Sequence, residues 1–226
     1  MMALRPIGPL PMLHVALVLV LIPWSTLRAA RTAPAPDPSK RLHHYRNVCS
    51  MLVVFGLFSW LVAWRTGIPL AGAPRQPLLS WAAAAALVAL FYCGLAPYRR
   101  LRVARRDPHA FMTAPHPGQL GWWALVSLSA GVAEELTYRG VASAILLYAG
   151  LPAWVVVLLV SAAFGLAHAN RGWIHVAATF GIGGLLHVLV LASGSLWPAM
   201  AVHAVYDFLA GVSYGRMVRE AERGGA

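Results

Sequence analysis

Charged residues are scarce in this chain, and acidic residues are scarcer than basic ones. Of the 226 residues, 11% are charged and 59% are hydrophobic. Soluble domains carry about 25% charged residues, so this chain lacks the charge that coats a globular surface. Several apolar runs reach the roughly 20 residues that a helix needs to cross a bilayer. The sequence therefore predicts an integral membrane protein, an all-α polytopic bundle of transmembrane helices.

Cysteine is also rare, and the common hydrolase motifs are absent. The two cysteines, Cys49 and Cys93, lie in apolar runs and form no CxxC or other Cys-rich metal pattern. We expect both to be buried free thiols. Neither GxSxG nor HExxH occurs, so nothing here indicates a nucleophile-elbow serine hydrolase or a zincin metalloprotease.

Most of the charged residues in the chain are basic. Eighteen Lys and Arg against seven Asp and Glu give a formal net charge of +11. These residues gather in short segments between apolar runs, as the positive-inside rule describes, rather than on one face of a domain. We therefore expect the lipid bilayer, with its anionic cytoplasmic leaflet, as a partner and no nucleic acid.

The apolar runs predict about seven transmembrane helices, within a range of six to eight. The first run, after Arg5, resembles a signal peptide but is longer than a usual signal core, so we expect an uncleaved helix. Gly150 and Pro152 end the fourth helix, and Pro198 suits the first turn of the last. The predicted helices cover residues 10–27, 48–64, 78–96, 121–148, 153–168, 173–191 and 198–212.

Two strongly basic segments, residues 28–46 and 97–118, are predicted to be loops between these helices. Prolines at positions 34, 36 and 38 prevent a helix from running through the first segment. The positive-inside rule places both loops in the cytoplasm and the N-terminus outside. Basic residues in the polar tail, 214–226, place the C-terminus in the cytoplasm as well. We expect an integral protein of the plasma (inner) membrane.

The most informative motif is Glu134-Glu135-Leu-Thr-Tyr-Arg139, which lies within the fourth predicted helix. A charge in the hydrocarbon costs roughly 2.5–3.5 kcal/mol on insertion scales, so such groups pair with one another or face a polar cavity. Residues four apart share a helix face, which makes Glu135 and Arg139 an ion pair in the favourable order. Glu134 then points elsewhere and stays free to titrate. The cluster is either functional or a structural lock between helices.

Two histidine motifs follow on later helices. Phe164 and His168 lie four apart, and a single His at a helix end is more often structural than catalytic. His203 and Asp207 also lie four apart, inside an otherwise apolar helix. Such a buried pair serves packing, metal binding or the stabilisation of an anion. Two other histidines, His175 and His187, have no polar partner at helical spacing and are predicted to be packing or lipid-interface residues.

These groups could converge in one cavity of the bundle. A free Glu beside a His in a partly dry site is a plausible general base for water. A second polar pair could stabilise the oxyanion of an attacked carbonyl. That chemistry is peptide hydrolysis by activated water.

Taken together, the three motifs resemble the CAAX prenyl protease and bacteriocin-processing family (CPBP, or Abi) of intramembrane proteases. EExxxR, FxxxH and HxxxD occur in order between residues 121 and 209, and Gly194-Ser195-Leu196-Trp197-Pro198 is similar to the family's lead-in to the last His. The apolar runs and basic segments predict N-terminal transmembrane helices with basic cytoplasmic loops over residues 1–119, and the resemblance concerns the part that follows. It implies a protease core over 120–213, in the C-terminal four helices; the pattern of polar residues sets the tail at 214–226.

The resemblance also implies roles for the site residues. Glu134 and His168 would activate water, and His203 and Asp207 would form the oxyanion hole. Glu135, Arg139 and Phe164 would support the site. The substrate would be a membrane-associated protein or peptide cleaved near its C-terminus or near a lipid anchor.

Asp207 departs from the family pattern, which commonly has Asn at this position. An amide can donate a hydrogen bond to an oxyanion, whereas an ionised carboxylate cannot. Either Asp207 is protonated, or it orients His203, which then donates alone. The remaining alternative is zinc, held by Glu134, His168, His203 and Asp207. We favour the metal-free reaction.

Two other functions compete with proteolysis. An immunity or scaffold protein would keep the polar cluster for packing, but the complete motif set argues against it. A proton-coupled transporter would use Glu134 and the histidines as a relay, but no internal repeat is evident.

Overall fold

The structure is a computed structural model that describes residues 8–70 and 72–224. Arg5, the charge before the first apolar run, lies outside these residues. Within the described residues, all regular secondary structure is helical and no strand occurs. The predicted all-α fold is therefore confirmed.

The N-terminal half contributes α1 to α6. Helix α1 continues through a π-helical turn (η1) into α2, which makes one helix of Pro9–Thr32. Residues 33–37 are not helical, as the prolines there predict, and α3 starts after a short 3₁₀ turn, η2. The bounds are α1 Pro9–Ala16, η1 Leu17–Leu21, α2 Ile22–Thr32, η2 Pro38–Lys40, α3 Arg41–Thr66, α4 Pro77–Gly94, α5 Ala96–Ala104 and α6 Pro108–Met112.

The C-terminal half contributes α7 to α11. A π-helical segment, η4, joins α7 to α8 without a break, so one helix covers the fourth predicted span. The bounds are η3 Pro117–Gln119, α7 Leu120–Glu135, η4 Leu136–Ala142, α8 Ser143–Tyr148, α9 Ala153–Leu166, η5 Ala169–Arg171, α10 Trp173–Ser193 and α11 Trp197–Gly224. Helix α11 runs unbroken through residues 214–224, which we had predicted to be a polar tail.

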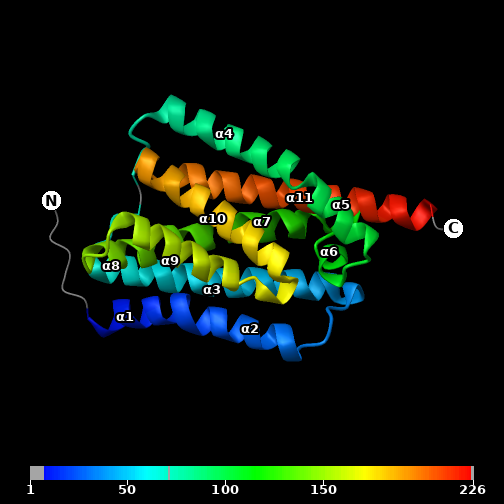
Figure 1. Cartoon of the computed structure of the whole chain (residues 1–226), viewed down its shortest axis with the longest axis horizontal. Coiled ribbons are helices and arrows are strands. Elements are labelled where there is room, and N and C mark those ends of the chain that lie inside the picture. The colour runs from blue at the N-terminus through cyan, green and yellow to red at the C-terminus, as the bar shows by residue number, and fades with distance from the viewer. Residues whose placement is uncertain (1–7, 71, 225–226) are drawn as a thin grey trace.

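The helices lie side by side with their long axes roughly parallel (Figure 1). Helix α7 is central and packs against α3 on one side and α11 on the other, while α9 packs against α10. The first helix is joined to this core by a buried chain of hydrogen bonds. His14 Nε2 lies 3.0 Å from Ser59 Oγ on α3, and Ser59 Oγ lies 2.8 Å from Thr137 Oγ1 in η4. The helix that bears the acidic motif is thus held from several sides.

The predicted loop over residues 97–118 is wrong in part, because α5 and α6 lie there. Two of its arginines are buried rather than solvated. The guanidinium of Arg99 donates to the carbonyl of Tyr92, and Arg102 Nε donates to Asp107 Oδ2 at 2.7 Å. Asp107 also caps α6 by accepting from the His109 backbone N–H. This arginine-rich run forms helices because Arg99 and Arg102 each donate a hydrogen bond to a group inside the fold.

The described helices are compatible with a membrane bundle. By length and composition, four can cross a bilayer: Pro9–Thr32, Pro38–Thr66, Pro77–Ala104 and Trp173–Ser193. Helix α9 is apolar but shorter, and the helices with the acidic and HxxxD motifs carry charge. All seven predicted segments are helical, whereas the number that cross the membrane stays a prediction.

The basic segments share one end of the bundle. Figure 1 shows the α2–α3 connection, helices α5 and α6, and the C-terminal end of α11 together at the right-hand end. Tyr214 and Val218 of α11 pack there against Val103 and Ala110. This common end agrees with placing both basic segments and the C-terminus on one side of a membrane, and the identity of that side stays a prediction.

Candidate active site

The acidic motif lies where the central helix changes from α to π geometry. Helix α7 ends at Glu135, and the wider η4 turn covers Leu136–Ala142. Ser143 Oγ donates to the Tyr138 carbonyl at 2.8 Å, which satisfies a carbonyl that the irregular turn could leave free. π-Helical turns are rare and occur frequently at functional sites. We had predicted an ordinary α-helix, so this irregularity is a correction.

Glu135 forms the predicted ion pair and a second bond that we had not predicted. Arg139 Nη1 donates to Glu135 Oε1 at 2.9 Å, and both side chains are 0% exposed. His203 Nδ1 lies 2.8 Å from the same oxygen. A carboxylate only accepts hydrogen bonds, so Nδ1 of His203 carries the proton. Glu135 therefore fixes the orientation of the His203 ring.

Arg139 is held in a space that a glycine leaves open. Its Cζ atom lies 4.3 Å from the centre of the Phe164 ring, a cation–π contact. A Cβ atom at Gly183 would lie 2.8 Å from Arg139 Nη2, so a side chain there would displace the guanidinium. His187 is 1% exposed and lies within electrostatic range of Arg139 and Glu135. His187 is thus a core residue, and the lipid-interface interpretation of it is wrong.

Glu134 has a different environment from its neighbour. Its side chain is 21% exposed, and its Oε2 lies 3.7 Å from His203 Nε2. This oxygen has no hydrogen-bond partner in the described part of the chain. Helical spacing predicted that one carboxylate would be paired and the other left free, and the geometry agrees.

Asp207 lies on the same edge of the His203 ring as Glu134. Its Oδ2 is 3.7 Å from His203 Nε2, one helical turn along α11. His203 is thus close to three carboxylates, with Nδ1 bonded to Glu135 and Nε2 facing Glu134 and Asp207.

His168 follows the end of α9, where backbone carbonyls lack helical partners. Its Nδ1 lies 2.9 Å from the Phe164 carbonyl, which can only accept, so Nδ1 holds the proton and Nε2 has a free lone pair. The Phe164 ring lies edge-on to both histidines, 4.9 Å from His168 and 5.9 Å from His203. Among the described residues no hydrogen bond joins His168 to Glu134; the two line one cavity.

That cavity has a volume of about 570 Å³ and contains more than the predicted residues. Glu134, His168, His203 and Asp207 all line it. So does His175, whose ring lies 5.9 Å from that of His168. Its position after a helix start gave no spacing signal, and the sequence interpretation of packing or lipid contact missed it.

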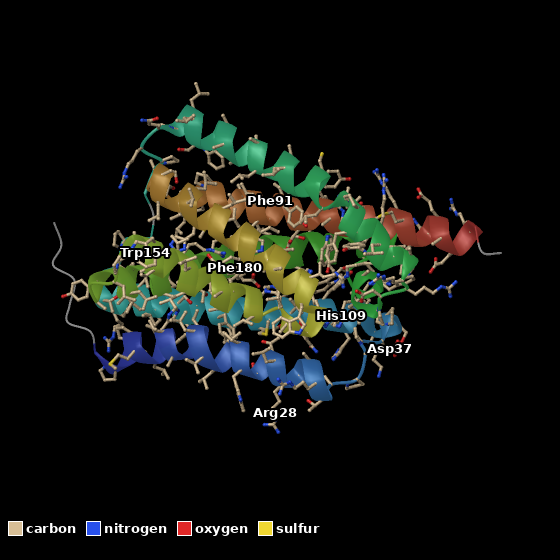
Figure 2. The ribbon with its side chains drawn as sticks, in the orientation of Figure 1. Arg28, Asp37, Phe91, His109, Trp154 and Phe180 are labelled. Carbon is tan, nitrogen blue, oxygen red and sulfur yellow. The ribbon has the colours of Figure 1, made fainter. Side chains whose placement is uncertain are left out.

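The N-terminal half also lines the cavity. Phe91 on α4 packs beside α11 (Figure 2). Beyond it are three polar residues of α5: Tyr98, Arg99 and Arg102. We had assigned no chemistry to this half, because its arginines match a pattern of solvated loops. Figure 2 shows His109 near α5 at the basic end, and Trp154 at the opposite end of the bundle.

The alternative to a metal-free reaction is a zinc ion held by Glu134, His168, His203 and Asp207, and the arrangement of these side chains bears on it. Within the part of the chain that the structure describes, no group of three or more His, Cys, Asp or Glu side chains could hold a metal ion. Both nitrogens of His203 face carboxylates, and Nδ1 of His168 is engaged by a carbonyl.

Comparison with known proteins gives one match. Residues 116–209 match the family model described as type II CAAX prenyl endopeptidase Rce1-like. This match confirms the resemblance noted from the three motifs and supports a membrane protease in general terms. No curated protein and no solved structure matches the chain.

Proposed function

We propose that this chain is an intramembrane endopeptidase that hydrolyses a peptide bond of a membrane-associated protein or peptide. The observation that carries the proposal is the division of the two adjacent carboxylates. Oε1 of Glu135 accepts two hydrogen bonds in a site with 0% exposure. Oε2 of each carboxylate has no hydrogen-bond partner among the described residues, but of the two it is Glu134 that is 21% exposed and lines the cavity. A base must keep an unoccupied lone pair, and Glu134 has one.

In this proposal Glu134 and His168 activate one water molecule. Glu134 removes a proton from the water as its oxygen attacks the carbonyl carbon of the scissile bond. Nε2 of His168 accepts a hydrogen bond from the second O–H of the water, because Nδ1 is held by the Phe164 carbonyl; that hydrogen stays on the oxygen that attacks. The proton on Glu134 then passes to the amide nitrogen as the C–N bond of the tetrahedral intermediate breaks, which releases one product with a free amine and one with a free carboxyl group.

The developing oxyanion is stabilised by His203 in the same proposal. With Nδ1–H held by Glu135, a second proton on Nε2 makes the ring a cationic donor that faces the cavity. Three neighbouring carboxylates stabilise that positive charge. Asp207 thereby acts as a positioning residue for His203, and the amide that the family commonly has there is not required.

The reaction in this proposal is metal-free. The support is that no group of three or more His, Cys, Asp or Glu side chains in the described residues could hold a metal ion. An immunity or scaffold protein is the second candidate function, and the buried Glu135–Arg139 pair would suit it, because that pair alone locks a helix. The position of Glu134 in the wall of the cavity favours the protease, since a structural lock needs no carboxylate there.

The test compares cleavage and stability in purified protein in detergent. We expect Glu134→Ala and His168→Ala each to lower the cleavage rate of a membrane-associated peptide by about 10²–10⁴-fold, the usual contribution of a general base. Both variants should keep the melting temperature of the wild type. Cleavage at the normal rate by both would overturn the assignment, and lost stability in both would favour the scaffold function. Exhaustive chelation should leave wild-type activity intact, whereas inactivation restored by Zn²⁺ would contradict the metal-free reaction.

A further inference from the structure

Three arginines line the cavity on the side of α5: Arg99, Arg102 and Arg171. The first two are 2% and 4% exposed, and Arg171, the last residue of η5, is partly buried. Asp107 is the one carboxylate that pairs with any of them in the described residues, through Arg102. Arg171 also lies within electrostatic range of Asp207 and Glu134, whereas Arg99 forms no ion pair with any carboxylate of the described residues.

Both carboxylate oxygens of Asp107 are hydrogen-bonded. Oδ2 accepts from Arg102 Nε, and Oδ1 accepts from the His109 backbone N–H at the start of α6. Burial raises the pKa of its carboxyl group, but the hydrogen bond and charge of Arg102 outweigh burial and the pKa is lowered. Asp107 thus stays ionised and neutralises one arginine. The charges of Arg99 and Arg171 remain uncompensated by it.

Several donors of this cluster are unused. Within the described chain, the Nε and Nη1 atoms of Arg99 and Nη2 of Arg102 are buried without a hydrogen-bond partner. Tyr206 and Tyr214 lie close to these arginines, but their neutral hydroxyls cannot balance a charge. Arg99 also stacks over Tyr92, with Cζ 4.7 Å from the ring centre. A buried guanidinium with free donors is costly unless an anion binds to it.

We propose that Arg99, Arg102 and Arg171 bind the free C-terminal carboxylate of the peptide substrate. The guanidinium fork matches a carboxylate in a two-bond geometry, which a single ammonium cannot do. This proposal rests on the proposed protease function and adds a specificity site to it. Arg99 and Arg102 lie outside the segment 116–209 that matches the family model, and Arg171 lies inside it, so both halves of the chain contribute to the site.

The same cavity connects this cluster to the reacting groups. Arg171 interacts electrostatically with Arg102 on one side and with Asp207 and Glu134 on the other. On α11, Asp207 faces the site and Tyr214 contacts Arg102, seven residues along the helix. That separation is about 10 Å at 1.5 Å per residue. An extended peptide covers it with about three residues, so a chain terminus can reach the arginines while a nearby peptide bond lies at Glu134.

The test uses two forms of one membrane-associated peptide, with a free C-terminal carboxylate or with a C-terminal amide. We expect the wild type to cleave the free acid with kcat/KM at least about tenfold higher than the amide, a typical effect of one charge-assisted contact. Arg99→Gln should lower kcat/KM for the free acid to that of the amide and leave the amide unchanged. Arg171→Gln provides a second variant if Arg99→Gln does not fold. Arg100→Gln, an exposed neighbour, is the matched control and should keep the preference.

Equal cleavage of acid and amide by the wild type would overturn the proposal. So would an equal loss on both substrates in Arg99→Gln and Arg171→Gln at unchanged melting temperature. A lipid phosphate is the rival ligand. If the Arg99→Gln defect appears in phosphatidylglycerol vesicles but not in phosphatidylcholine vesicles, whichever terminus the peptide has, the arginines bind lipid and the proposal is wrong.

Binding separates this proposal from the protease function itself. In the Glu134→Gln protein, which should not turn over substrate, the free acid should bind at least about tenfold more tightly than the amide. If the free acid binds more tightly than the amide but the wild type cleaves neither peptide, the carboxylate site stands and the protease function is rejected. Cleavage by the wild type with equal binding of the two peptides would retain the protease and reject the carboxylate site.

Discussion

Glu134 and Glu135 are neighbours in the chain with opposite surroundings. Glu135 is buried and bonded to Arg139 and His203, whereas Glu134 lines the cavity. Successive residues of a helix point about 100° apart, so one helix can place a structural and a reactive carboxylate side by side. The separation of the two roles follows from this geometry and from the single arginine four residues later.

The buried pair gives a prediction about stability. Arg139→Gln leaves the Glu135 carboxylate in a site with 0% exposure and without its arginine. We expect a loss of about 3–5 kcal/mol in the free energy of unfolding, as for other broken buried pairs. Denaturant titration in detergent would measure it.

A double variant supplies the control for that prediction. Glu135→Gln combined with Arg139→Gln removes both charges, so it should be less destabilised than Arg139→Gln alone. Arg216→Gln, at an exposed position of α11, should change stability by less than about 0.5 kcal/mol. A free energy for Arg139→Gln within that same margin of the wild type would show that the pair does not hold the fold.

At the scale of elements, the site depends on how closely α7 approaches α11. Gly131 lies one turn before Glu134, and a Cβ atom there would lie 2.8 Å from the Ala204 nitrogen and the Met200 carbonyl oxygen. Backbone atoms cannot move aside as a flexible side chain can. The glycine therefore sets the distance between the helix of Glu134 and the helix of His203.

Gly131→Ala should push these helices apart. We expect a loss of about 1–3 kcal/mol in stability, the usual cost of overpacking. Cleavage should fall by up to about 10²-fold, because small displacements of reacting groups are costly. Gly121→Ala on the same helix meets no atom within 4 Å and is the matched control; it should be neutral or slightly stabilising. If both alanine variants behave alike in melting and cleavage assays, the close approach does not matter.

Helix positions were predictable from sequence to the extent that apolar runs and prolines define them. The Glu135–Arg139 pair was predictable because it is local. The π-helical turn and the bond from His203 to Glu135 were not, since each depends on helices that meet only in the folded chain. Helix α5 was not predicted, because a run of arginines is typical of a solvated loop. These arginines can be buried because Arg99 donates to the Tyr92 carbonyl and Arg102 to Asp107, contacts that form only in the folded chain.

At the scale of the whole molecule, one cavity joins the two halves of the chain. The matched segment supplies Glu134, His168, His203 and Asp207, and the N-terminal half supplies Arg99 and Arg102. Figure 1 shows α5 and the end of α11 side by side at the basic end. The first hundred residues therefore complete the wall of the cavity as well as the bundle.

The central claim is that Glu134 reacts and Glu135 supports, and one comparison tests it most directly. The cleavage rate and the melting temperature are measured for Glu134→Gln and Glu135→Gln beside the wild type. We expect Glu134→Gln to lower the cleavage rate by at least about 10²-fold at an unchanged melting temperature, and Glu135→Gln to lower the melting temperature. A Glu134→Gln protein that cleaves its substrate at the wild-type rate would contradict the account.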